Sequence, residues 1–162
     1  MHDAAMFSNV ALLGFGEAGS TFARAGDWVG ARAFDIADRT AACDAAGVLS
    51  CSSAQGALEG ALLVLSLVTA DAAVDVAGEA ARHIGEGALY CDMNSVAPDS
   101  KRAAARLIEQ AGGCYVDVAV MAPVNPLRLA VPLLIAGPHA ERADAALEAL
   151  GRTGGAPKLA AL

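Results

Sequence analysis

Apolar runs alternate with segments of helical periodicity along the chain, and this alternation predicts its secondary structure. Seven runs are expected to form strands, at residues 7–14, 30–35, 48–51, 61–68, 88–93, 114–121 and 131–137. Six segments are expected to form helices, at residues 17–26, 38–47, 53–60, 70–84, 98–111 and 139–151. The strand runs lack a polar face, as in a sheet that helices cover on both sides. The order of elements therefore predicts an α/β fold with a doubly wound, mostly parallel sheet.

Two details refine this expected fold. Only about ten residues, without a helical pattern, connect run 114–121 to run 131–137, which is short for the crossover of a parallel pair. The last strand is therefore expected to run antiparallel at the edge of the sheet. Helix ends are marked by Gly26, by Asp38 as an N-cap, by Gly47 after the second helix, and by Pro98 at the first position of helix 98–111.

Composition and charge narrow the class of protein. Of the 162 residues, 56% are hydrophobic and 18% are charged, which indicates a globular domain. The net charge of −7 argues against nucleic-acid binding, because no basic surface is available to neutralise phosphates. The longest apolar run, 61–68, is too short to span a bilayer, and Asp3 stands where a secretory signal would be basic. We therefore expect a soluble, cytoplasmic protein that binds neither nucleic acid nor a membrane.

The cysteines and histidines do not form a metal-binding pattern. The sequence has no Cys-x-x-Cys pair, and its three histidines are scattered. Cys43, Cys51, Cys91 and Cys114 are therefore expected to be reduced, and no metal is expected.

A glycine-rich turn directly follows the first expected strand. Gly14, Gly16 and Gly19 form the pattern Gly-x-Gly-x-x-Gly between a strand and a helix, which is the setting that a dinucleotide-binding turn requires. In such turns the first glycine permits the sharp bend, the second lets the backbone approach a diphosphate, and the third allows close helix–strand packing. Free N–H groups at the start of the helix then face the phosphates. We predict a Rossmann-type domain whose diphosphate-binding segment is Gly14, Phe15, Gly16, Glu17, Ala18 and Gly19, with the Glu17 carboxylate in solvent.

An acidic residue stands where such a domain binds the adenosine ribose. Asp35 lies 21 residues after Gly14, at the end of the second expected strand. Its carboxylate would accept hydrogen bonds from both ribose hydroxyls and would repel a 2′-phosphate, so it favours NAD over NADP. Arg39, four residues later, reduces that preference. The alternative is that Asp35 has only a structural role at the end of a strand. A flavin dinucleotide or S-adenosylmethionine would also suit Asp35, although the glycine turn is of the diphosphate-binding type.

Three further segments have the order found in one family. Residues 64–77, 92–123 and 131–138 include the motifs Asp-x-x-Ser-x-x-Pro and Asp-x-x-Val. With them, the chain from residue 7 to about 150 resembles the N-terminal domain of the β-hydroxyacid dehydrogenases, the family of 6-phosphogluconate dehydrogenase and 3-hydroxyisobutyrate dehydrogenase, and most of all its phosphogluconate-dehydrogenase-like branch. The resemblance implies that the nicotinamide-ribose side of the cofactor is lined by Leu67, Val68, Thr69, Asn94 and Ser95. Thr69 and Ser95 have an alternative role, as caps of the helices that follow them.

The same resemblance indicates where a substrate would bind, and there the sequence departs from the family. Met121 and Ala122 stand where typical members have the serine and glycine that hold the substrate. We expect a more apolar pocket, so neither 3-hydroxyisobutyrate nor 6-phosphogluconate is carried over as the substrate. Asn125 and Arg128 in the following loop are candidates to hold an anionic substrate, or else ordinary solvated loop residues.

The family's catalytic lysine lies beyond this domain, in an all-helical second domain that also forms most of the dimer. Lys158 comes only seven residues after Gly151 and beside Pro157, too early to be that lysine. We therefore expect no catalytic residue in this chain, a dinucleotide-binding domain at 1–151, and a tail at 152–162 that starts a connection. A fragment of a dehydrogenase of about twice this length, homodimeric when complete, is the favoured expectation; a truncated gene product and a domain whose partner is another chain are the alternatives.

Two functions fit these expectations. The first is the cofactor-binding domain of an NAD-dependent oxidoreductase that oxidises a small β-hydroxy acid by hydride transfer to the nicotinamide. The second is a non-catalytic NAD-binding or redox-sensing module.

Overall fold

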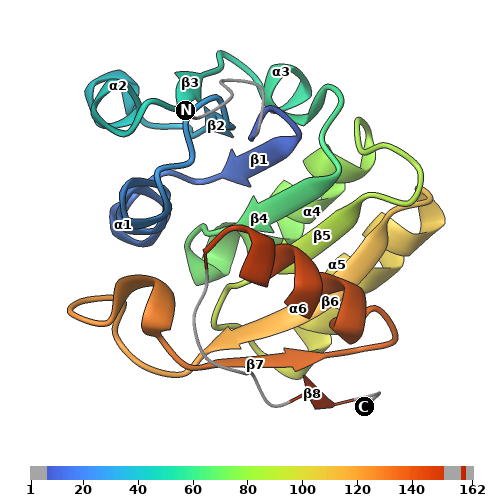
Figure 1. Ribbon diagram of the computed structural model, residues 1–162. Coiled ribbons are helices and arrows are strands. Elements are labelled where there is room, and N and C mark those ends of the chain that lie inside the picture. Colours follow the sequence, from blue (N-terminus) through green and yellow to red (C-terminus); the bar gives the residue numbers. More distant parts are fainter. Residues whose placement is uncertain (1–6, 152–157, 160–162) are drawn as a thin grey trace.

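The computed structural model describes residues 7–151 and 158–159, and in this part of the chain eight strands form one sheet (Figure 1). The strand order is β3-β2-β1-β4-β5-β6-β7-β8, and every neighbouring pair is parallel except β6 and β7. The order reverses between β1 and β4, as in doubly wound sheets, so the predicted fold class is confirmed. The strands are β1 (Val10–Leu13), β2 (Arg32–Phe34), β3 (Leu49–Ser50), β4 (Leu63–Ser66), β5 (Leu89–Asp92), β6 (Cys114–Val120), β7 (Leu133–Ala136) and β8 (Lys158–Leu159).

The C-terminal side of the sheet differs from the expectation in one respect. β7 runs antiparallel to β6, as the short connection predicted. However, β8 pairs in parallel with the outer side of β7, so β7 is not the edge strand and that part of the prediction is wrong. Two residues are too few to show the alternating or continuous apolar pattern by which a strand is recognised.

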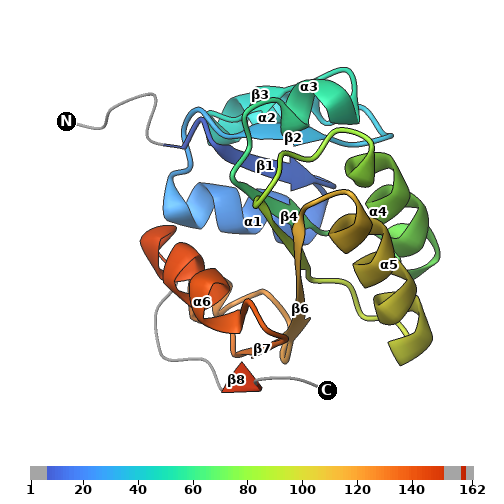
Figure 2. The same cartoon turned by 90° about the vertical axis from the view of Figure 1, so that its right-hand side faces the viewer.

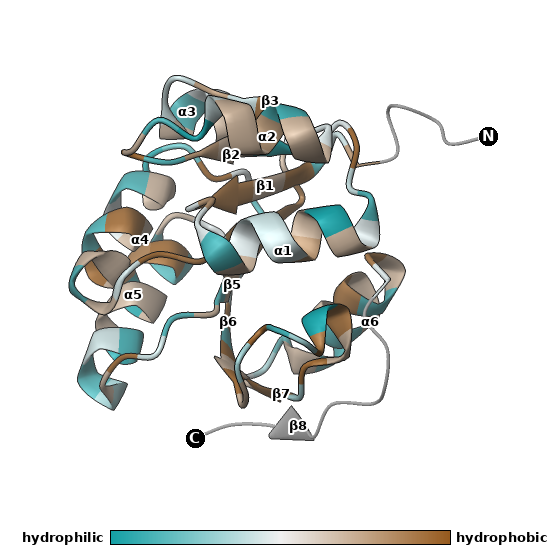
Figure 3. Cartoon of the chain, turned by 90° about the vertical axis from the view of Figure 1, so that its left-hand side faces the viewer, coloured by the Kyte–Doolittle hydropathy of each residue, from teal (hydrophilic) through white to brown (hydrophobic). Residues whose placement is uncertain are grey.

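Helices cover both faces of the sheet, and each face has its own hydrophobic core. Helices α1, α2 and α6 pack on one face, and α3, α4 and α5 pack on the other. Figure 2 shows α1 and α6 on the side of the sheet opposite to α4 and α5. Figure 3 shows hydrophobic residues along the central strands and hydrophilic residues on the outer surfaces of the helices. The helices are α1 (Glu17–Gly26), α2 (Thr40–Ala46), α3 (Ala54–Leu58), α4 (Ala73–Ala81), α5 (Pro98–Gln110) and α6 (Ala140–Ala149), with short 3-10 turns η1 (Ala70–Ala72) and η2 (Arg128–Ala130).

The predicted helix ends agree with the structure at some positions and differ at others. Pro98 occupies the first position of α5, and Gly47 ends α2 in the left-handed conformation with φ 72°. α1 also ends at Gly26, as predicted, and Asp27 takes the left-handed cap at φ 53°. The N-cap residue of α2 is Arg39 and not Asp38, although Asp38 Oδ1 accepts a hydrogen bond at 3.0 Å from the N–H of Thr40, the first residue of the helix.

One buried hydrogen bond joins the early and late parts of the described chain. Trp28, which follows α1, is 2% exposed, and its Nε1 donates to the carbonyl oxygen of Leu150 at 2.8 Å. Leu150 directly follows α6, so α1 and α6 are tied together over the same face of the sheet.

Candidate functional site

The carboxyl ends of β1, β2 and β4 surround a cavity of about 450 Å³. Parallel strands end at the same edge of a sheet, and ligands of open α/β sheets bind at this edge, where the strand order reverses. The cavity is lined by six of the residues that the sequence analysis singled out, namely Gly14, Gly16, Asp35, Leu67, Val68 and Thr69. The structure thus brings the glycine turn, the acidic residue and the end of β4 together.

The glycine turn is fixed by close backbone packing. Gly14 has φ +97° and donates its N–H to the carbonyl oxygen of Phe34 at 2.8 Å. A Cβ on Gly14 would overlap the carbonyl oxygen of Leu67, and a Cβ on Gly19 would lie 2.9 Å from the carbonyl oxygen of Gly14. Gly14 and Gly19 therefore allow β1, β4 and α1 to approach one another. Gly16 differs, because nothing lies within 4 Å of a Cβ placed there.

The N-terminus of α1 opens beside this turn without a side-chain cap. Gly16 is the N-cap residue, and no side chain accepts a hydrogen bond from the first turn. The first N–H groups of a helix have no carbonyl partner within the helix, and they attract anions. Glu17 is exposed, as expected.

Asp35 binds the glycine turn as well as lining the cavity. Its Oδ2 accepts the N–H of Phe15 at 2.8 Å, and its Oδ1 accepts the N–H of Ala37 at 2.9 Å. The guanidinium Nε of Arg39 lies 3.5 Å from Oδ2. Partial burial raises the pKa of Asp35, but these two N–H groups and Arg39 outweigh it, so the pKa is lowered overall. A carboxylate offers about four lone pairs, so Asp35 keeps the capacity to accept hydroxyl groups as well.

These features fit a dinucleotide better than a smaller anion. The Phe15 N–H is already used by Asp35, which leaves the amides from Gly16 onward for phosphate groups. The open space at Gly16 and the cavity toward Asp35 provide room for a diphosphate and an attached ribose.

The residues predicted for the nicotinamide side are divided between two cavities. Leu67, Val68 and Thr69 line the first cavity, and Thr69 is exposed without a capping hydrogen bond to η1. Asn94 and Ser95 line a second cavity of about 460 Å³, between α5 and the strands β6 and β7. Ser95 is exposed, and the N-cap of α5 is Ala97, so Ser95 does not cap that helix.

The side chain of Asn94 is occupied within the protein. Asn94 is 5% exposed, and its Oδ1 accepts the N–H of Val68 at 2.7 Å. Its Nδ2 donates to Ser66 Oγ at 3.0 Å and to Asp92 Oδ1 at 2.8 Å. The amide thus links the ends of β4 and β5.

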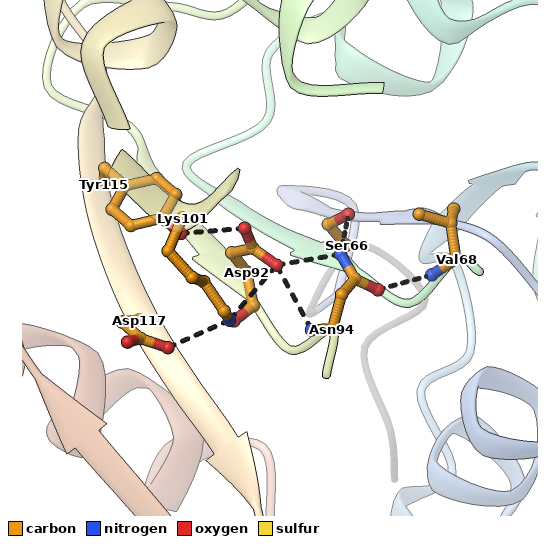
Figure 4. Close-up of polar contacts among 7 residues, drawn as sticks. All are labelled: Ser66, Val68, Asp92, Asn94, Lys101, Tyr115 and Asp117. Atoms are coloured by element: carbon orange, nitrogen blue, oxygen red, sulfur yellow. Dashed lines mark hydrogen bonds and ion pairs between the residues drawn. The ribbon is translucent and has the colours of Figure 1, made fainter. Parts of the chain in front are cut away.

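Four charged or polar residues lie behind Asn94 (Figure 4), and the sequence analysis gave them no role, although Asp92 and Asp117 begin the two family motifs. Lys101 Nζ donates to Asp117 Oδ1 at 2.9 Å and to the main-chain carbonyl of Asp92 at 2.8 Å, and lies 3.4 Å from Asp92 Oδ1. The hydroxyl of Tyr115 donates to Asp92 Oδ2 at 2.7 Å. Burial first, and then the Asp92 carboxylate, raise the pKa of Tyr115, so the phenol stays protonated. The sequence did contain a signal for this cluster, because Asp92 and Asp117 each lie in a strand of the sheet. A buried carboxylate requires a polar or charged partner, so a partner for these side chains could have been expected.

The four candidate substrate residues lie apart from both cavities. Met121 is 60% exposed, Asn125 and Arg128 are exposed, and Ala122 packs against the core. None of them lines either cavity. Their role in substrate binding therefore stays a prediction.

The described residues hold no group of metal-binding side chains, and the four cysteines are free. Burial raises the pKa of the Cys91 thiol to about 12, so it stays protonated and unreactive. Within the described chain, none of the helices has the length and apolar character needed to cross a bilayer.

A doubly wound sheet with a glycine turn at its switch point defines the class of dinucleotide-binding Rossmann domains. The sequence model of the NAD-binding domain of 6-phosphogluconate dehydrogenase matches residues 9–158. The chain belongs to this family, and its cofactor is of the nicotinamide type.

Several solved structures share this fold. A conserved hypothetical protein from Sinorhizobium meliloti 1021 is 35% identical with a TM-score of 0.82, over 94% of this chain and 53% of that protein. A 3-hydroxyisobutyrate dehydrogenase from Mycobacterium tuberculosis, solved with L-serine, is 24% identical with a TM-score of 0.76, and the match covers 93% of this chain and 52% of that protein. An imine reductase from Streptomyces aurantiacus is 25% identical with a TM-score of 0.72, and the match covers 93% of this chain and 55% of that protein. The chain thus spans about half the length of these structures. A comparison with curated proteins found no match.

Proposed function

We propose that the chain binds NAD along the carboxyl edge of its sheet. The N–H groups from Gly16 onward hold the diphosphate, Asp35 holds the adenosine ribose, and the segment from Leu67 to Thr69 faces the nicotinamide ribose. The observation that carries this proposal is the uncapped N-terminus of α1, which opens beside a cavity that Asp35 also lines. When bound, the nicotinamide ring supplies the hydride acceptor or donor.

Asp35 favours NAD over NADP in this proposal. Its carboxylate is ionised near the position of the ribose hydroxyls and would repel a 2′-phosphate. Arg39 reduces this repulsion, because its guanidinium lies 3.5 Å from the same carboxylate. We therefore place NAD first and NADP second.

The proposed activity of the complete protein is that of an oxidoreductase acting on a small hydroxy acid. This rests on the family and on the relatives, whose chains are about twice as long. The chain of 162 residues is expected to bind NAD without oxidising hydroxy acids, because none of its residues is assigned the role of the family's catalytic lysine. Calorimetric titration with NAD, and absorbance at 340 nm over a panel of β-hydroxy acids, test both statements. Oxidation of a hydroxy acid by this chain alone would contradict the expected lack of activity. Failure to bind NAD would contradict the proposed binding site.

NAD affinity is expected to be independent of pH between about 5 and 8. The pKa of Asp35 lies below its ordinary value of 3.8, so its carboxylate remains ionised throughout this range and is protonated only in stronger acid. Titration at several pH values measures this directly. A loss of affinity with a midpoint above about pH 5 would show that a different group controls binding.

A further inference from the structure

A buried polar network crosses the ends of β4, β5 and β6, between the two cavities (Figure 4). At one end, the N–H of Val68 donates to Asn94, which in turn donates to Asp92. At the other end, Lys101 lies against Asp92 and donates to Asp117. Val68 lines the first cavity, and Lys101 and Asp117 line the second. The network therefore connects the candidate cofactor site with a helix outside it.

The first end of the network also touches the glycine turn. The N–H of Val68 and the carbonyl of Leu67 belong to the same peptide group. Its N–H is held by Asn94, and its carbonyl oxygen lies so close to Gly14 that a Cβ there would overlap it. Rotation or displacement of this peptide would therefore disturb the turn.

Lys101 stabilises the other end by placing one positive charge between two neighbouring carboxylates. Asp92 and Asp117 are directly paired in register on adjacent strands, and the side chain of Asp92 is 1% exposed. Two close carboxylates in a buried position repel each other unless a cation lies between them. Without the ammonium group of Lys101, Asp92 would keep the hydroxyl of Tyr115 and the groups of Asn94 as partners but would face Asp117 without a cation between them, which should weaken its hold on Asn94.

We propose that Lys101 is a positioning residue of the cofactor site, which fixes Asp92 and Asn94 and thereby holds the Leu67–Val68 peptide against Gly14. Its importance for binding rests on the proposed function, whereas the coupling from Lys101 to the peptide is a property of the chain without cofactor. Lys101 itself does not touch the cofactor in this proposal.

The coupling is tested by hydrogen exchange at the Val68 amide, followed by NMR in the chain without cofactor. Lys101→Met should speed this exchange at least about tenfold, because the bond to Asn94 weakens. Arg106→Met is the matched control, since it removes one positive charge from the exposed side of the same helix. Lys101→Arg keeps the charge and should restore most of the protection. Asp117→Asn, at a residue with a 30% exposed side chain, removes the carboxylate that repels Asp92, so in the Lys101→Met background it should restore part of the protection; this double variant serves if Lys101→Met alone does not fold.

The consequence for binding is tested with NAD and with AMP. Lys101→Met should lower the affinity for NAD about tenfold, because the peptide beside the glycine turn is displaced. AMP should lose less affinity than NAD, at most about threefold, because it lacks the nicotinamide ribose that we place against the segment from Leu67 to Thr69. A general loss of stability would not produce this difference between the two ligands.

The outcomes separate the two proposals. Unchanged Val68 exchange in a folded variant, or equal weakening of NAD and AMP, would overturn the role of Lys101 while leaving NAD binding intact. A wild-type chain that does not bind NAD would overturn the proposed function, and with it the role of Lys101 in that function.

Discussion

A Gly16→Val protein is expected to lose only about 1 kcal/mol in its free energy of unfolding, because valine is a poorer N-cap than glycine, but to bind NAD at least about 100-fold more weakly. Nothing lies within 4 Å of a Cβ at Gly16, so the added side chain meets no protein atom at its base. It would instead occupy the open space beside the first amides of α1, where we place the diphosphate. Urea unfolding gives the free energy of unfolding, and calorimetry gives the affinity.

Two other glycines provide the controls for Gly16→Val. A Cβ at Gly85 also meets nothing within 4 Å, but Gly85 lies outside the cavity, so Gly85→Val should leave NAD affinity unchanged. Gly14→Ala should lower the free energy of unfolding by about 1–3 kcal/mol, because of its φ of +97° and the overlap with Leu67. If Gly16→Val binds NAD as tightly as Gly85→Val does, the diphosphate is not held at this turn.

An Asp35→Ala protein is expected to lose about 30-fold in its preference for NAD over NADP. The substitution removes the acceptor for the ribose hydroxyls and the negative charge that repels a 2′-phosphate, and it leaves Arg39 free to pair with that phosphate. Affinities for both cofactors are measured on the same preparation, and their ratio is the decisive quantity. The ratio is decisive because Asp35 also accepts hydrogen bonds from the N–H groups of Phe15 and Ala37. Loss of these bonds would disorder the turn and lower the affinity for both cofactors by the same factor, which leaves the ratio unchanged.

Asp38→Ala is the matched control for Asp35→Ala. It removes an equal charge three residues later, from an exposed carboxylate that accepts the N–H of Thr40. The ratio of affinities should stay at its wild-type value in this protein. An equal ratio in both variants would remove Asp35 from the ribose site.

The sequence predicted the part of the structure that depends on local patterns. The alternation of apolar runs and helical segments gave the order of elements, and the spacing from Gly14 to Asp35 placed these two residues at one cavity, as observed. These elements can be predicted from sequence because a strand, a tight turn and the start of a helix each require particular residue types at consecutive positions.

Contacts between distant segments were not predictable in the same way. Asn94 was expected at the cofactor, yet its side chain bonds to Val68, Ser66 and Asp92. Lys101 was given no role in the sequence analysis, because its two carboxylate partners lie on separate strands. These partners are set by sheet register and helix packing, which a single sequence does not display.

The bond between Trp28 and Leu150 has a consequence for folding during synthesis. The indole of Trp28 is enclosed beside α6, whose residues are translated more than a hundred positions later. A nascent chain that has emerged only as far as β5 must leave this ring in water and its N–H without its native acceptor. The segment at Trp28, although encoded early, is therefore expected to reach its final setting only after nearly the entire described chain has been translated.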